Sequence, residues 1–205
     1  MIALEIKYSV EYEVHRVKET LKELSWYKEN GYDVLYPQGL SETSSEDEIA
    51  AAVLNTYSEE EYAIYAGMLN SLWENYLPKL KNTRAILPFD LRDTYIVVLT
   101  QYGTNGSYFP EESKIIINRA RRDKDTVLGT LMHEIVHISV EHLIKKYAVS
   151  HWRKERLVDL LCEKYFSDIR KMRDLTQEDV SPVDIAFTEK YPDIEAITQV
   201  IGSNK

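Results

Sequence analysis

The segment His133-Glu134-Ile135-Val136-His137 places two histidines four positions apart within an apolar stretch of the chain. On an α-helix, residues four apart are offset by about 40° and lie about 6 Å apart along the axis, so both imidazoles leave one face. Glu134 then lies roughly 100° further round the helix. This pattern indicates two metal ligands, with a carboxylate beside the metal as a base.

The surroundings of this motif favour a helix. Val127, Leu128, Leu131 and Met132 continue the apolar pattern at helical spacing before the first histidine. Residues 125–126, Asp and Thr, are each suited to cap the start of the helix. The sequence therefore predicts that both histidines lie on a buried, regular helix, which is the setting that two ligands at this spacing require.

A metal site needs further ligands, and catalytic zinc sites take a third one from the protein while leaving the fourth position to water. The segment that follows the motif is amphipathic and carries Glu155 and Asp159 on one helical face. A turn near residues 148–150 lets this segment run back against the motif helix, which favours Glu155 as the third ligand. His151 and Asp159 are the alternatives. With Glu155 on the metal, Asp159 is placed to accept the free ring N–H of a ligating histidine.

On these residues the chain resembles the gluzincin-type (thermolysin-like) HExxH zinc metallopeptidases, which are zincins. The resemblance rests on His133, Glu134, His137, Glu155 and Asp159. It implies a Zn²⁺ ion held by the two histidines and Glu155. It further implies that Glu134 acts as the general base which activates water, and that the substrate is a protein or peptide.

The resemblance covers about residues 94–166, and within it the chain departs from the family. Lys154 stands before the third ligand, where the family often has Asn. A metzincin would have Gly and His where this chain has Val140 and Leu143, so that group is excluded. The run Lys114–Asn118 looks like the family's substrate-side edge strand, which would bind an extended peptide by strand addition. The alternative for this run is a strand paired on both sides.

The pattern of elements predicts an α+β protein with a zincin-like catalytic domain. That domain would contain a small mixed or antiparallel sheet, an active-site helix and a C-terminal helix that carries the third ligand. Residues 94–100 read as a buried strand of this sheet. We expect an α-rich N-terminal subdomain over residues 1–90, the catalytic core over 91–170 and a helical tail over 171–205.

Several local signals refine this division. The first residues read as a strand, residues 9–30 as one helix ended by Gly31, and residues 32–36 as a short strand. Ser45 and Ser58, each followed three positions later by Glu, indicate capping boxes of two further helices. The second of these helices should reach about residue 80 and pack its aromatic stripe against the catalytic core. In the tail, two prolines indicate helix starts and Gly202 a helix end.

Charge and composition restrict the partners. A net charge of −9 and a pI near 5.1 disfavour nucleic acid and anionic membranes. The single Cys162 excludes an internal disulfide framework, and the N-terminal segment lacks the apolar run of a signal peptide, so we expect a cytoplasmic protein. A local exception is the basic run Arg119, Arg121, Arg122 and Lys124, which we interpret as a solvated loop partly neutralised by neighbouring acids.

The sequence therefore predicts a zinc-dependent endopeptidase, with Glu134 as its general base. The alternative is a catalytically silent zincin-fold protein that regulates or binds a peptide, and the intact Glu134 favours the enzyme. Tyr147, His151 and Tyr165 are candidates for stabilising the developing oxyanion, and the sequence does not choose among them.

Overall fold

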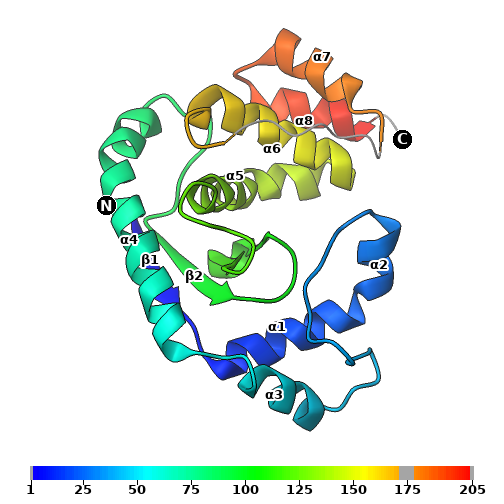
Figure 1. The fold of residues 1–205 in the computed structure, drawn as a ribbon. Helices are drawn as coiled ribbons and strands as arrows, with labels where there is room; N and C mark the ends of the chain where they lie inside the picture. Colours follow the sequence, from blue (N-terminus) through cyan, green and yellow to red (C-terminus); the bar gives the residue numbers. More distant parts are fainter. Residues whose placement is uncertain (1, 171–177, 204–205) are drawn as a thin grey trace.

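The computed structural model describes residues 2–170 and 178–203, and its class is α+β, as predicted (Figure 1). Within these residues it contains eight α-helices, one 3-10 helix and one four-stranded mixed sheet. The helices are α1 (Val10–Lys22), α2 (Leu24–Glu29), α3 (Glu46–Leu54), α4 (Glu59–Arg84), α5 (Val127–Lys146), α6 (His151–Phe166), α7 (Ser181–Lys190) and α8 (Ile194–Ser203). The strands are β1 (Ala3–Lys7), β2 (Thr94–Thr100), β3 (Gly106–Phe109) and β4 (Lys114–Asn118), with the 3-10 helix η1 (Pro110–Glu112) between the last two.

The sheet has the strand order β1-β2-β4-β3. The first three strands in this order run parallel, and β3 pairs antiparallel with β4. The N-terminal strand β1 thus pairs with β2, so the sheet joins residues from both sides of the subdomain boundary expected near residue 90. Helix α5 lies between the sheet and a layer that contains α6 and α8 (Figure 1).

Of the two alternatives for Lys114–Asn118, the strand paired on both sides is confirmed and the edge strand is wrong. This segment, β4, pairs with β2 on one side and with β3 on the other, so β3 is the edge. The three isoleucines of β4 are all buried, including neighbours that point to opposite faces of the sheet. An unbroken apolar run of this kind is typical of an interior strand covered on both faces.

The N-terminal region differs from the prediction in two places. The helix expected over residues 9–30 is interrupted at Glu23, and the second part, α2, turns so that Trp26 packs edge-on against His151 of α6. Residues 32–36 form only an isolated bridge between Leu35 and Gly103, not a strand. Pro37 follows directly and lacks an N–H for a longer ladder.

The predicted helix starts are confirmed where side-chain caps are present. Ser45 and Glu48 form a complete capping box at α3, and the hydroxyl of Ser58 accepts the backbone N–H of Glu61 at α4. Helix α4 continues past residue 80 to Arg84, and its aromatic stripe is buried in the main core, as expected. Its contact with the core therefore comes from the 3.6-residue period of the apolar positions.

The C-terminal helices α7 and α8 pack on α5 and α6, while residues 171–177 of the expected tail lie outside the described residues. Gly202 does not end the last helix but lies within α8. A Cβ atom there would come within 2.1 Å of the Tyr147 carbonyl oxygen, so glycine permits the close approach of α8 to the end of α5. None of the helices in the described ranges has the length and apolar character needed to cross a membrane.

A buried carboxylate joins α1 to the sheet and to α4. Glu13 accepts hydrogen bonds from the Tyr62 hydroxyl and from the backbone N–H of Gln101, the latter at 2.6 Å. Burial raises the pKa of Glu13 to about 6. The Glu13 carboxyl therefore keeps its proton to a higher pH in the folded protein than in the unfolded chain, whose glutamates ionise near pH 4.3.

We predict that this difference makes the protein less stable as the pH rises through about 4.5 to 6. Relative to Glu13→Gln, the free energy of unfolding of the natural protein should fall by about 2 kcal/mol over this window, because one pKa unit corresponds to about 1.4 kcal/mol. Urea denaturation at a series of pH values measures the difference. Glu29→Gln, at an exposed position, is the control, and an identical pH dependence of the natural protein and Glu13→Gln would contradict the prediction.

Candidate metal centre

Helix α5 carries both histidines of the motif into the interior. His133 and His137 are 4% and 1% exposed, and their ring planes are nearly perpendicular, at 86°. Thr126, one of the two expected residues, is the N-cap of this helix, but the side chain that accepts backbone N–H groups there belongs to Asp123. The Asp123 carboxylate accepts the backbone N–H groups of Asp125 and Thr126, whereas the side chain of Thr126 makes no capping bond.

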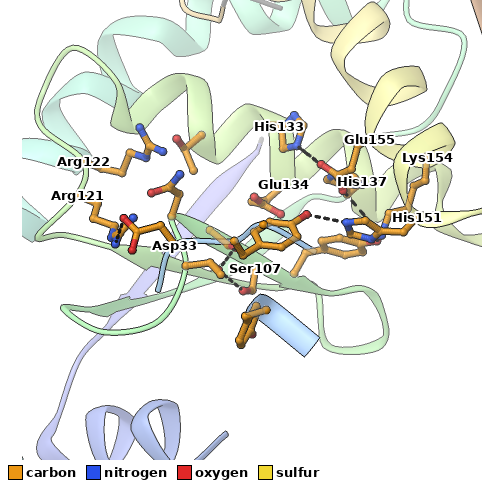
Figure 2. Close-up of a pocket in the computed structure, with 18 of the residues that line it drawn as sticks. Asp33, Ser107, Arg121, Arg122, His133, Glu134, His137, His151, Lys154 and Glu155 are labelled. Atoms are coloured by element: carbon orange, nitrogen blue, oxygen red, sulfur yellow. Dashed lines mark hydrogen bonds and ion pairs between the residues drawn. The ribbon is translucent and has the colours of Figure 1, made fainter. Parts of the chain in front are cut away.

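A left-handed residue, Ala148 (φ 50°), turns the chain between the two ligand-bearing helices, and Ser150 precedes α6. Helix α6 then runs along α5 and presents Glu155 to the two imidazoles (Figure 2). The Glu155 carboxylate oxygens lie 3.2 Å from His137 Nε2 and 3.4 Å from His133 Nε2. The structure thus brings together the three side chains that the sequence favoured as metal ligands.

The spacing of these ligand atoms suits a small tetrahedral ion. The two Nε2 atoms are 3.0 Å apart, and Glu155 places a different oxygen near each of them, Oε1 at 3.2 Å from His137 and Oε2 at 3.4 Å from His133. Four ligands at the Zn–N and Zn–O bond lengths of 2.0–2.1 Å lie roughly 3.3 Å from one another in a regular tetrahedron. The donors present, two imidazole nitrogens and a carboxylate, therefore fit Zn²⁺ in type, and the distances between the imidazole nitrogens and the nearest carboxylate oxygens are close to this spacing.

Asp159 lies behind the first histidine. Its Oδ1 atom is 3.3 Å from His133 Nδ1 and 3.5 Å from the guanidinium of Arg170. A carboxylate on Nδ1 fixes the imidazole ring and directs Nε2 toward Glu155. Asp159 therefore orients the His133 ring through Nδ1, and His133 Nε2 is left to face Glu155.

The electrostatics of the cluster favour a positive charge between its acids. Burial lowers the pKa of His137 to about 3, so this ring is neutral near pH 7, the form that binds metals. Burial opposes ionisation of Glu155, but the two imidazoles beside it hold the pKa of its carboxyl well below the usual range. Burial also opposes a charge on His133, yet hydrogen bonds to Asp159, Cys162 and Glu155 raise its pKa.

Glu134 lies outside this ligand group. Its side chain is 7% exposed and lines a cavity of about 570 Å³ into which His133, His137 and Glu155 also open (Figure 2). The edge strand β3 comes so close that a Cβ atom on Gly106 would lie 2.5 Å from Glu134 Oε1. Glycine at this position therefore lets the sheet edge reach the carboxylate. In the sequence, Gly106 was recognisable only as part of a turn signal.

Aromatic side chains from distant segments form much of the cavity wall. Tyr108 of β3 stacks on the His137 ring at 4.6 Å between centroids, and its hydroxyl donates to Glu141 at 2.7 Å. Trp26 and Tyr32, from α2 and the loop after it, also line the cavity. Sequence reasoning missed these residues because no local pattern relates them to the motif.

Of the three candidates for stabilising the oxyanion, His151 lies at the cavity and Tyr147 and Tyr165 do not. His151 lines the cavity and its Nε2 lies 2.6 Å from the Tyr32 hydroxyl, but it does not belong to the ligand group. Tyr147 instead donates to Glu195, and Tyr165 bonds with Tyr191, both away from the cavity. His151 is thus the candidate for contact with a bound substrate.

No known protein family, curated protein or solved structure matches the chain. The functional assignment therefore depends on the site itself. Among the described residues, the buried His133, His137 and Glu155 form the one group with three potential metal-ligand atoms within 4.8 Å of one another. This donor set of nitrogen and oxygen suits zinc, and imidazole also suits other first-row metals.

We predict that the protein binds about one zinc ion per chain and that Glu155→Ala reduces its metal content to background, because removing one of three protein ligands leaves only the histidine pair. Mass spectrometry of the metal after dialysis measures the stoichiometry. Glu163→Ala, an exposed position on the same helix, should keep the metal. Unchanged stoichiometry in Glu155→Ala would reassign the third ligand.

Proposed function

We propose that this chain is a zinc-dependent endopeptidase of the thermolysin-like, gluzincin type, with a zincin-like catalytic domain. The observation that carries the proposal is the convergence of His133, His137 and Glu155 on one point, with the separate carboxylate of Glu134 in the same cavity. A motif helix beside a mixed sheet with an antiparallel edge strand supports the zincin-like assignment.

The arrangement divides the chemistry between ligands and base. A zinc ion held by the three ligands would supply Lewis acidity toward the scissile carbonyl and lower the pKa of a bound water toward 7. Glu134, which is not a ligand, would take the proton from the attacking water and deliver it to the leaving nitrogen. Its burial beside Gly106 keeps bulk water away from the carboxylate during this transfer.

The sheet edge offers a surface for the peptide. Strand β3 pairs with β4 on one side, and no other described strand lies on its second side. A peptide in extended conformation would add to this edge by backbone hydrogen bonds. Gly106 and Tyr108 both line the cavity, so β3 would guide the peptide past Glu134 and His137. We therefore assign the peptide-binding role to β3, in place of residues 114–118 that the sequence suggested.

The developing oxyanion needs a hydrogen-bond donor or positive charge besides the metal. We assign this role to His151, whose orientation is held by the Tyr32 hydroxyl at 2.6 Å and by edge-on contact with Trp26. Both partners come from the N-terminal region, so α2 and the loop that follows it would complete a site otherwise built from the sheet, α5 and α6.

We predict that Glu134→Gln keeps the zinc ion and lowers peptide hydrolysis by about 10²- to 10⁴-fold, because glutamine preserves the shape of the side chain and removes the base. Turnover of a quenched fluorescent peptide library, measured with and without a chelator, tests this. Glu163→Gln serves as the control with unchanged activity. A Glu134→Gln protein with zinc and undiminished turnover would exclude the proposed base.

Zinc binding in the natural protein without any cleavage would favour the alternative role of a silent peptide-binding zincin. Glu134 argues for the enzyme, because a protein that only binds peptides has no chemical need for a buried carboxylate beside its metal ligands.

A further inference from the structure

Three arginines line the cavity away from the metal ligands: Arg121, Arg122 and Arg170. Figure 2 shows Arg121 and Arg122 on the opposite side of Glu134 from His137. We call these three residues the arginine cluster. In a chain with a net charge of −9, a concentration of positive charge inside the candidate substrate cavity calls for a physical explanation.

The backbone around the arginine cluster is held in place by specific contacts. The Tyr65 hydroxyl donates to the backbone carbonyl of Arg122 at 2.6 Å. Arg170 follows the end of α6, where the chain passes close to the first turn of α5. A Cβ atom on Gly129 would lie 2.1 Å from the Ile169 carbonyl oxygen, so glycine at this position permits the approach that brings Arg170 to the cavity.

Two of the three arginines have a carboxylate within ion-pair distance. Arg121 pairs at 2.7 Å with Asp33, whose side chain is 85% exposed, and Arg170 lies 3.5 Å from Asp159, which also serves His133. Within the described residues, Arg122 takes part in no ion pair. Its pKa is lowered by burial and then by the charge of Arg170, with a further contribution from Arg121.

The expectation that this basic run is only a solvated loop therefore holds for part of it. Lys124 is exposed, as expected, whereas the Arg119 side chain is 13% exposed, pairs with Glu61 and stacks on Tyr62. Arg121 and Arg122, by contrast, face the cavity. The contact of Arg121 with Asp33 already shows that a carboxylate fits against this wall.

We propose that the arginine cluster binds a carboxylate of the peptide substrate, from an Asp or Glu side chain or from the C-terminus, so that the enzyme selects acidic peptides. This inference rests on the proposed peptidase function and names its substrate class. Guanidinium groups match carboxylates by paired hydrogen bonds, and a partly desolvated site strengthens them. A bound carboxylate would also relieve the repulsion among the three cations.

The position of the cluster along β3 gives the selection a direction. Asn118 at the end of β4 donates its backbone N–H to Asn105, just before β3, and the loop with Arg121 and Arg122 follows. Tyr108 of β3, three residues beyond Asn105, stacks on His137. The carboxylate would thus lie toward the Asn105 end of a peptide on β3, and the metal ligands toward the Tyr108 end.

Peptide binding to zinc-loaded Glu134→Gln protein tests the proposal without turnover. The probes are fluorescein-labelled decapeptides, acetylated and amidated, in which a single Glu is moved through an Ala/Ser/Leu sequence, and the same peptides with Gln. A further set carries Gln and a free C-terminal carboxylate, which separates the two sources of the charge. Fluorescence anisotropy measures the affinities at low and high salt.

We expect a carboxylate peptide to bind about tenfold more tightly than its neutral counterpart, as for a hydrogen bond to a charged group. Arg122→Gln should remove this preference, with Arg121→Gln as the second variant if the first does not fold. Lys124→Gln, in the same loop but outside the cavity, should leave it unchanged. Asp33→Asn should tighten binding, because it removes a competing carboxylate.

Equal or absent binding of charged and neutral peptides at every position would overturn the proposal, as would an equal loss of preference in Lys124→Gln and Arg122→Gln. Cleavage by the natural protein is scored separately. A preference that persists when the natural protein cleaves nothing would retain the carboxylate site and reject the peptidase. Cleavage of charged and neutral peptides at equal rates would retain the peptidase and reject the carboxylate site.

Discussion

The meeting of Glu155 with two imidazoles is the contact on which both the fold around α5 and the proposed chemistry depend. Glu155 and Asp159 are buried on one face of α6, and Glu134 is buried on α5. Carboxylates brought this close in a low-dielectric interior repel one another unless positive charge lies between them. His133, placed between two of these acids, can provide it, and a divalent ion at the proposed ligand atoms would do the same. The packing of α6 on α5 and the affinity for a cation are therefore coupled, because the same side chains decide both.

The other wall of the site depends on a contact far from the motif. Arg16 of α1, 6% exposed, donates hydrogen bonds to Thr104 at 3.1 Å and to Ser107 at 3.0 Å, on the turn before β3 and on β3 itself. Gly103 has a φ of 86°, and a Cβ atom on it would overlap the Arg16 guanidinium. The N-terminal helix thus fixes the edge strand that approaches Glu134. This contact gives the N-terminal region a role in shaping the cavity as well as in packing the core.

The metal ligands could be predicted from the sequence because helical periodicity is local. The spacing of His133 and His137, and that of Glu155 and Asp159, each defines a helical face without any knowledge of the fold. The edge strand could not be predicted in this way, since the order of strands is a long-range property and both β3 and β4 border the same turn. An unbroken isoleucine run did carry a signal for an interior strand. Trp26, Tyr32 and Arg170 reach the cavity only through tertiary contacts, so no spacing in the sequence relates them to the motif.

The central claim is that His133, His137 and Glu155 hold one metal ion and that Glu134 is not a ligand of it. Crystals of the protein grown with zinc, with diffraction data collected above and below the zinc absorption edge, test it most directly. The account predicts one anomalous peak at about 2.0–2.2 Å from both Nε2 atoms and a Glu155 oxygen, and further away from Glu134. Zinc-loaded crystals without a peak at this position, or with a peak coordinated by Glu134, would contradict it.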